Sequence, residues 1–212
     1  MLRVRLVRPS ATRPILFTTL LALALQACGP EADERYAGSL FPLVPGATWD
    51  YLVSDERGAP GARTVRVAGA EDGLLVLETR QDGRVQRSFL QGQGLVLAVR
   101  EEAVAPDGLE TVQLFEPGAL RAIARADVRP GQVFEHSWQQ RNGLGVEEIT
   151  ARWTVEATGL RIPSGNGLFE DAVRIRRTQS DGNDALLWYA PGVGLVRARG
   201  AEQLELVHWA LP

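Results

Sequence analysis

The fold is decided by a repeated pattern that is clearest in residues 149–156, which read Ile-Thr-Ala-Arg-Trp-Thr-Val-Glu. Apolar Ile149, Ala151, Trp153 and Val155 alternate with polar residues. Successive side chains of a β-strand point to opposite faces, so this period of two predicts a strand with one face in a core and one in water. No window after the N-terminal segment has a convincing helical period, which favours an all-β domain.

Turn signals separate these strand-length segments. Asn-Gly and Asp-Gly pairs supply the positive φ angles of tight hairpin turns, so their recurrence predicts an antiparallel meander. The pairs of this kind, with one Gln-Gly, are Asp72-Gly73, Asp82-Gly83, Gln93-Gly94, Asp107-Gly108, Asn142-Gly143, Asn166-Gly167 and Asp181-Gly182.

About twelve strands are expected between these turns. Their ranges are 48–54, 62–69, 73–81, 84–91, 94–101, 109–116, 132–140, 145–157, 169–180, 184–190, 194–200 and 202–210. Residues 117–127 are the least strand-like, and we expect one short helical turn or a loop there. Because a flat sheet of about twelve strands is improbable, the prediction is a strongly curved meander that forms an open barrel or half-barrel.

The N-terminus has the pattern of an export signal. Four arginines precede an apolar run at residues 15–25, which is too short for a spanning helix, and small Ala27 precedes Cys28, the single cysteine. This ending resembles a bacterial lipobox. It predicts that residues 1–27 are a lipoprotein signal peptide and that Cys28 becomes the acylated N-terminus. The alternative is an ordinary cleaved signal that leaves Cys28 as an incidental thiol.

Lipidation of Cys28 would place the protein in the cell envelope, facing the periplasm. Each buried acyl methylene contributes about 0.8 kcal/mol, so several acyl chains anchor a protein stably to a membrane. Gly29 is compatible with the outer membrane if the host has two membranes. We expect residues 28–39 to form the lipidated cysteine and a flexible tether, and residues 40–212 to form a single β-domain.

The charge excludes two classes of partner. The predicted signal peptide carries 4 of the 23 basic residues and none of the 26 acidic ones, which leaves a net charge of −7. Nucleic acids and anionic headgroups require clustered positive charge, so neither is an expected partner.

A search for catalytic or metal-binding patterns predicts no enzyme and no cofactor. His136 and His208 lack a nearby cluster of further metal ligands, so core or edge positions are the expected ones. We expect His208 to share a face with Leu204 and Leu206. Ser137 should point away from its neighbour His136 on a strand, and the adjacent acidic pairs of the chain should diverge in the same way.

Three segments resemble a family of bacterial lipoproteins with a TapB-like β-domain. They are Phe41-Pro42-Leu43 with Gly46 and Trp49-Asp50-Tyr51, then residues 162–173, and finally the segment Trp-Tyr-Ala-Pro-Gly-Val-Gly-Leu-Val at 188–196. The resemblance implies a fold akin to the half-barrels of the lipoprotein carriers LolA and LolB, and it implies no chemistry. The residues to which we assign a structural role in these segments are Trp49, Phe169, Trp188, Pro191, Gly192 and Gly194.

Two functions remain open. The first is a membrane-anchored, non-catalytic binding or structural module that meets a protein or wall partner through a sheet edge or its loops. The alternative is a carrier or sensor that holds an apolar ligand in the concave face of the sheet. A carrier needs a hollow of roughly 300 Å³ or more lined by apolar side chains, whereas a surface-binding module should be solidly packed.

Overall fold

The computed structural model describes residues 34–55, 59–92, 94–105, 108–165 and 167–212. The predicted signal peptide, Cys28 and Gly29 lie outside these residues. A 3₁₀ turn, η1 (Glu34–Tyr36), precedes twelve strands in the described chain. These are β1 (Thr48–Asp55), β2 (Pro60–Glu71), β3 (Leu74–Gln81), β4 (Arg84–Gln91), β5 (Leu95–Ala105), β6 (Gly108–Ile123), β7 (Val133–Asn142), β8 (Gly145–Ser164), β9 (Gly167–Gln179), β10 (Ala185–Ala190), β11 (Gly194–Arg199) and β12 (Glu202–Ala210).

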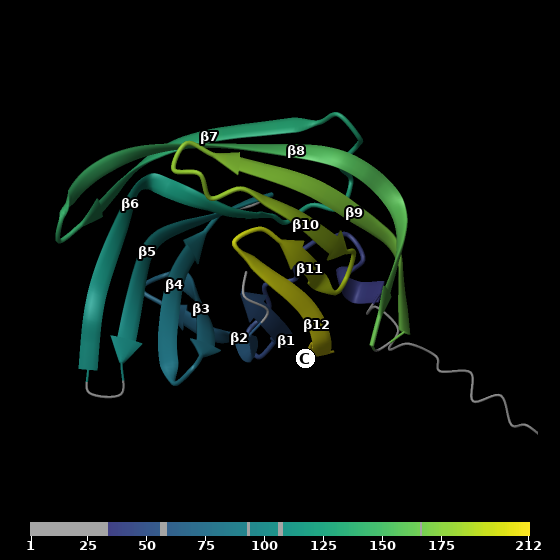
Figure 1. Cartoon of the computed structure of the whole chain (residues 1–212), viewed down its shortest axis with the longest axis horizontal. Coiled ribbons are helices and arrows are strands. Elements are labelled where there is room, and N and C mark those ends of the chain that lie inside the picture. The colour runs from purple at the N-terminus through teal and green to yellow at the C-terminus, as the bar shows by residue number, and fades with distance from the viewer. Residues whose placement is uncertain (1–33, 56–58, 93, 106–107, 166) are drawn as a thin grey trace, which may run out of the picture.

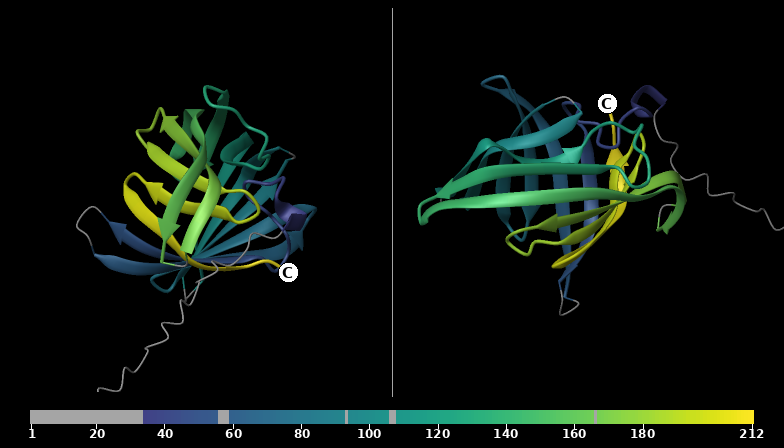
Figure 2. Two further views of the ribbon diagram at one scale, coloured as in Figure 1. Left: turned by 90° about the vertical axis from the view of Figure 1, so that its right-hand side faces the viewer. Right: turned by 90° about the horizontal axis from the view of Figure 1, so that it is seen from above.

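The strands form an antiparallel meander in which each pairs with its neighbours in the sequence (Figures 1 and 2). The predicted all-β class, the curvature and the twelve strands are confirmed. The barrel is closed because β1 also pairs with β12, whereas we expected an open barrel or half-barrel. The shortest pairings have three residue pairs each: β6 with β7, where residues 114–116 face residues 139–141, and β11 with β12.

The turns at 72–73 and 82–83 follow the predicted chemistry, whereas the pair Asn142-Gly143 does not, because neither residue has a positive φ. Asp72 and Gly73 have φ values of 53° and 78°, and Asp82 and Gly83 have 51° and 78°. Both central residues of each turn thus have positive φ, as a two-residue type I′ turn requires. These turns fix the register of β2 with β3 and of β3 with β4.

The expected helical turn or loop at residues 117–127 is wrong for its first part, because β6 runs on to Ile123. The Glu116–Pro117 peptide is cis, Gly118 has a φ of 140°, and the pairing with β5 shifts register at this point. A bulge therefore absorbs the proline, and the strand resumes beyond it. Leu120 and Ile123, which suggested a helix by their spacing, are buried on the resumed strand.

The barrel closes where the first and last strands meet. Trp49 of β1 is fully buried, and its indole Nε1 donates a hydrogen bond of 2.6 Å to the carbonyl oxygen of Val193. Gly194 has a φ of 119°, and a Cβ atom there would lie 2.9 Å from the Trp49 Nε1. Only glycine meets both demands, so the opening and closing segments of the sequence pack as one unit.

The adjoining turn ties the N-terminal segment to the same place. Gly192, whose φ is 74°, follows Pro191 in the turn between β10 and β11, and its amide donates to the carbonyl oxygen of Ser39 at 2.8 Å. Phe41 stacks on Trp49 with ring centroids 5.3 Å apart. These contacts hold the chain that enters the barrel against the β10–β11 hairpin.

A second apolar cluster contains Phe169 and Trp188, which are 7% and 8% exposed. Phe169 lies 5.3 Å from the ring of Trp209 of β12, and the far end of β8 contacts β12. The β8–β9 hairpin therefore bends back over the closing strands. Its length exceeds the prediction, because β8 continues to Ser164.

The N-terminal segment is held to the domain from Glu34 onward. Arg35 donates a hydrogen bond of 2.8 Å to the carbonyl oxygen of Pro212, and the Gly38 carbonyl oxygen accepts one from the Ala126 amide. Ser39 forms a β-bridge with Arg125. Residues 34–39 thus do not behave as the flexible tether predicted for 28–39, because backbone hydrogen bonds fix them. What remains of that prediction concerns residues 28–33, outside the described chain.

Candidate functional site

The inward face of the barrel changes from apolar to polar along its strands. In β9 the inward positions are occupied in turn by Val173, Ile175, Arg177 and Gln179. In β3 they are occupied by Leu75, Leu77, Thr79 and Gln81. The apolar ends of these strands pack into the main core with Leu40 and Trp153, both fully buried. The polar ends face a hollow.

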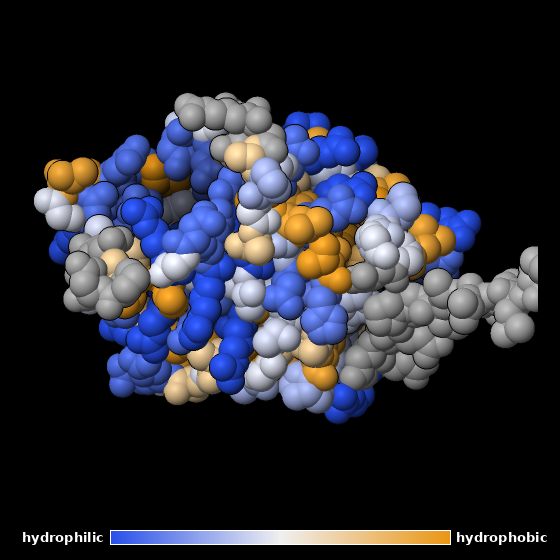
Figure 3. Space-filling view, turned by 60° about the horizontal axis from the view of Figure 1, so that its bottom comes forward, coloured by the Kyte–Doolittle hydropathy of each residue, from blue (hydrophilic) through white to orange (hydrophobic). Residues whose placement is uncertain are grey.

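This hollow is a cavity of about 1050 Å³ inside the barrel. Its rim includes the exposed residues Asp82 and Arg84 at the β3–β4 turn and Asp181 and Asn183 in the β9–β10 loop. The space-filling view of Figure 3 shows a recess bordered by hydrophilic side chains on this face of the molecule. The concave side is therefore not solidly packed, and its lining is mainly polar rather than apolar.

Two ion pairs are built into the cavity wall. Arg121 contacts Glu101 at 2.7 Å, and Glu101 also accepts hydrogen bonds from Gln86 at 2.9 Å and Ser88 at 3.2 Å. On another side of the cavity, Arg63 pairs with Glu202 and donates from Nε to Gln81 at 2.7 Å. Because three donors hold Glu101, this carboxylate is a fixed part of the wall.

A third arginine of the cavity, Arg177, is arranged differently. Its Nη2 donates to the neutral side-chain oxygen of Asn183 at 2.8 Å, and its Nε is buried without a hydrogen-bond partner in the described residues. No carboxylate among the described residues lies within 4.0 Å of its guanidinium. Burial lowers the pKa of Arg177, and the nearby Arg121 adds to this effect, while Tyr189, Asp181 and Asp184 oppose it.

The inner end of the cavity is apolar. Phe41, Leu77, Leu195 and Leu204 contribute to the lining and also pack against the main core. Tyr51 joins them, and its hydroxyl donates to the Leu195 carbonyl oxygen at 2.9 Å. Burial raises the pKa of Tyr51, so this hydroxyl stays protonated and available as a donor. The cavity thus combines charged and amide groups on its walls with an apolar base.

The two histidines do not form part of the cavity lining. His136 is half-buried, and its Nε2 lies 2.7 Å from the Gly118 carbonyl oxygen, across the narrow β6–β7 seam. We expected His208 to share a face with Leu204 and Leu206. For Leu206 this expectation is wrong, because Leu206 is buried and His208 is exposed. A register shift in the β1–β12 pairing sets Tyr51 opposite Leu206 but Asp50 opposite His208, which turns His208 outward.

Ser137 lies on the exposed face of β7, where its hydroxyl is 2.9 Å from that of Thr150. In the described part of the chain, no group of three or more His, Cys, Asp or Glu residues is placed to hold a metal ion. Among these same residues, no helix is long and apolar enough to cross a bilayer.

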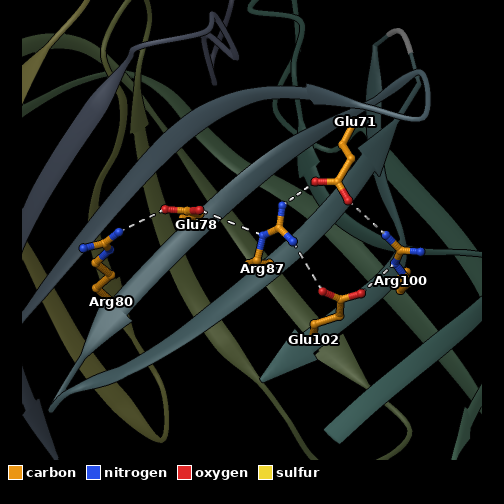
Figure 4. Close-up of polar contacts among 6 residues, drawn as sticks. All are labelled: Glu71, Glu78, Arg80, Arg87, Arg100 and Glu102. Carbon is orange, nitrogen blue, oxygen red and sulfur yellow. Dashed lines mark hydrogen bonds and ion pairs between the residues drawn. The ribbon is translucent and has the colours of Figure 1, made fainter. Parts of the chain in front are cut away.

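The outer face of β2–β5 carries a network of six charged side chains (Figure 4). Arg87 contacts Glu71, Glu78 and Glu102, and Arg100 contacts Glu102 at 3.2 Å. Both guanidinium groups cover the ring of Phe89, at 5.1 and 3.7 Å from its centroid, and Phe89 is fully buried. The network contains three arginines and three glutamates, so its positive and negative charges balance. Two of its arginines cover the side chain of Phe89.

Whether the concave face is hollow or packed could not be decided from the sequence, and its polar lining was not predicted, although a signal for it exists. Positions two residues apart in one strand pass from Val173 and Ile175 to Arg177 and Gln179. The first two indicate a core face, and the same face continues into the polar pair. A face that changes from apolar to polar in several strands at once indicates a barrel whose interior is only partly filled.

Comparison with known proteins gives no sequence relative: no protein-family model matches the chain, and no curated protein matches it. The TapB-like resemblance therefore has no support from a family match. Among solved structures, one similar chain is from Bacteroides fragilis and is described as an inferred exported protein with a YmcC-like fold. It is 14% identical, with a TM-score of 0.47, and the match covers 82% of this chain and all of that one.

A second similar structure is from Parabacteroides distasonis and is described as an inferred lipoprotein. It is 15% identical, with a TM-score of 0.40, and the match covers 82% of this chain and 99% of that one.

Proposed function

We propose that the protein is a lipid-anchored, non-catalytic envelope protein that binds a small polar or amphiphilic molecule inside its barrel. The observation that carries this proposal is the cavity of about 1050 Å³ with its polar walls. Ligand sites in proteins typically measure about 300–1,000 Å³ and place a few polar groups against an apolar surface. The volume of the cavity is at the upper end of this range, and its lining combines polar walls with an apolar base.

The closed sheet favours this function over the surface-binding module. Each of the twelve described strands has a strand neighbour on both sides, so strand addition at a free edge is disfavoured. The polar walls also favour a polar or amphiphilic ligand over the purely apolar one expected from a carrier. An apolar ligand would leave Glu101, Arg177 and the lining glutamines without the water that solvates them.

The topology supports a mouth that faces away from the membrane. The rim loops follow β3 and β9, whereas the chain enters β1 and leaves β12 at the other end of the meander. Residues 28–33 would span about 20 Å at most. A domain anchored through Cys28 would thus stand close to the bilayer on its packed end and take up its ligand from the periplasm.

The test is native mass spectrometry of the chain from residue 29 onward, exported without the cysteine that would be lipidated and purified from the periplasm of its own host. Ala103 lines the cavity, so Ala103→Trp should obstruct it. Val112 pairs with Glu102 on the outer face and is 37% exposed, so Val112→Trp is the matched control. A small bound mass in the wild type and in Val112→Trp that is absent from Ala103→Trp supports the proposal. A bare wild-type mass contradicts it and favours a surface-binding module.

A further inference from the structure

We infer that Arg177 binds an anionic group of the ligand, with Arg121 as a second guanidinium, and that the ligand is an amphiphilic organic acid. This inference rests on the proposed function of the cavity and names the chemical class of its ligand. Its support comes from the position of Arg177, its missing counter-charge and the surfaces around it.

Arg177 is placed inward by the register of its strand. It pairs with Trp153 of β8 and Ala185 of β10, and it lines the cavity together with Gln179 two residues later. Its neighbour Arg176 points to the outer face, is exposed and pairs with Glu156. The two adjacent arginines thus have opposite environments, so a substitution of Arg176 is a matched control for the same substitution of Arg177.

The counter-charges of the cavity are distributed unevenly. Glu202 compensates Arg63 and Glu101 compensates Arg121, but the described residues place no carboxylate within ion-pairing distance of Arg177. Asp181 and Asp184 lie in the adjacent loop, and their carboxylates accept hydrogen bonds from the backbone amides of Asn183 and Gln179. An anion in the cavity would supply the missing charge.

A guanidinium group matches an oxyanion in shape as well as charge. Its fixed fork of N–H donors binds a carboxylate, sulfonate or phosphate through two parallel hydrogen bonds. Arg177 uses Nη2 on Asn183, and Arg121 is close enough to lower the pKa of Arg177. Two positively charged guanidinium groups in one cavity repel each other, and one bound anion would stabilise both.

The remaining surfaces indicate an organic body. Phe41, Leu77, Leu195 and Leu204 form an apolar base that an inorganic anion would leave uncovered. Burial of apolar ligand surface there contributes favourably, at roughly 25 cal/mol per Å². An acid with an apolar portion therefore uses both parts of the cavity.

The experiment compares two fluorescent probes with the same aromatic body. These are 8-anilinonaphthalene-1-sulfonate and its uncharged analogue N-phenyl-1-naphthylamine, titrated into the chain from residue 29 onward. The wild type should bind both. Arg177→Gln should weaken sulfonate binding by about tenfold or more, because a charge-assisted hydrogen bond is lost, and should change binding of the neutral probe by less than about twofold. Arg176→Gln should change neither.

The outcomes separate the ligand class from the cavity itself. If Arg177→Gln weakens both probes equally, or weakens the sulfonate no more than Arg176→Gln does, the inference is wrong while the cavity stands. If the wild type binds neither probe, or if Ala103→Trp leaves both affinities unchanged, the proposed function itself fails. Arg177→Met, which also removes the charge, replaces Arg177→Gln if circular dichroism finds the glutamine variant unfolded.

Discussion

Replacement of Gly194 by alanine tests the contact that closes the barrel. The new Cβ atom would lie 2.9 Å from Nε1 of the fully buried Trp49, and the residue would have to keep a φ of 119°. The backbone conformation costs about 1–3 kcal/mol for a residue with a side chain. Displacement of Trp49 from the Val193 carbonyl oxygen leaves a buried donor unpaired, which costs about 1–3 kcal/mol more.

We therefore expect Gly194→Ala to lower the free energy of unfolding by about 2–6 kcal/mol, measured by urea denaturation. Gly69→Ala is the control for backbone conformation, since Gly69 has a φ of 142° and a Cβ atom there would meet no other atom within 4 Å. Gly143→Ala, with open space and no positive φ, should change stability by less than about 0.5 kcal/mol.

The reasoning would be refuted if Gly194→Ala cost no more than Gly69→Ala. A further comparison isolates the indole. In a Trp49→Phe background the atom nearest to the new Cβ is gone, so the cost of Gly194→Ala should shrink toward that of Gly69→Ala. If the cost stays undiminished, Trp49 is not the obstacle.

Two other substitutions test contacts on each face of the barrel by the same denaturation measurement. Phe89→Ala should lower the free energy of unfolding by about 3–5 kcal/mol, because the ring is fully buried beneath Arg87 and Arg100. A decrease below about 1 kcal/mol would show that the guanidinium groups do not cover a packed side chain. Tyr51→Phe should cost about 0.5–1.5 kcal/mol through loss of the hydrogen bond to the Leu195 carbonyl oxygen, and an unchanged midpoint would argue against that bond.

Local sequence signals predicted most of the fold. The Asp-Gly pairs at 72–73 and 82–83 form the expected turns, and the alternation at 149–156 places Ile149, Trp153 and Val155 in the core. These signals are reliable because turn geometry and the period of a strand depend on adjacent residues. The β6 strand beyond Pro117 was missed because its pairing with β5 outweighs the local preference of the proline.

Closure and the cavity depend on contacts between distant residues. Trp49 and Val193 are 144 positions apart, and nothing local to either segment predicts that they meet. Inward polar residues such as Gln179 have the same sequence pattern as solvent-facing ones, because both kinds face water. The orientation of His208 was missed for a related reason, since one irregularity in pairing reverses the face of every later residue.

The proposed function depends most directly on the barrel being hollow at its polar end, and Ala103→Trp measures this. An indole group entering a cavity of about 1050 Å³ should find room, so the urea-unfolding free energy of Ala103→Trp should stay within about 1 kcal/mol of that of Val112→Trp on the outer face. A loss larger than about 2 kcal/mol relative to that control would mean that the new side chain meets a packed interior, and it would contradict the assignment of this space to a ligand.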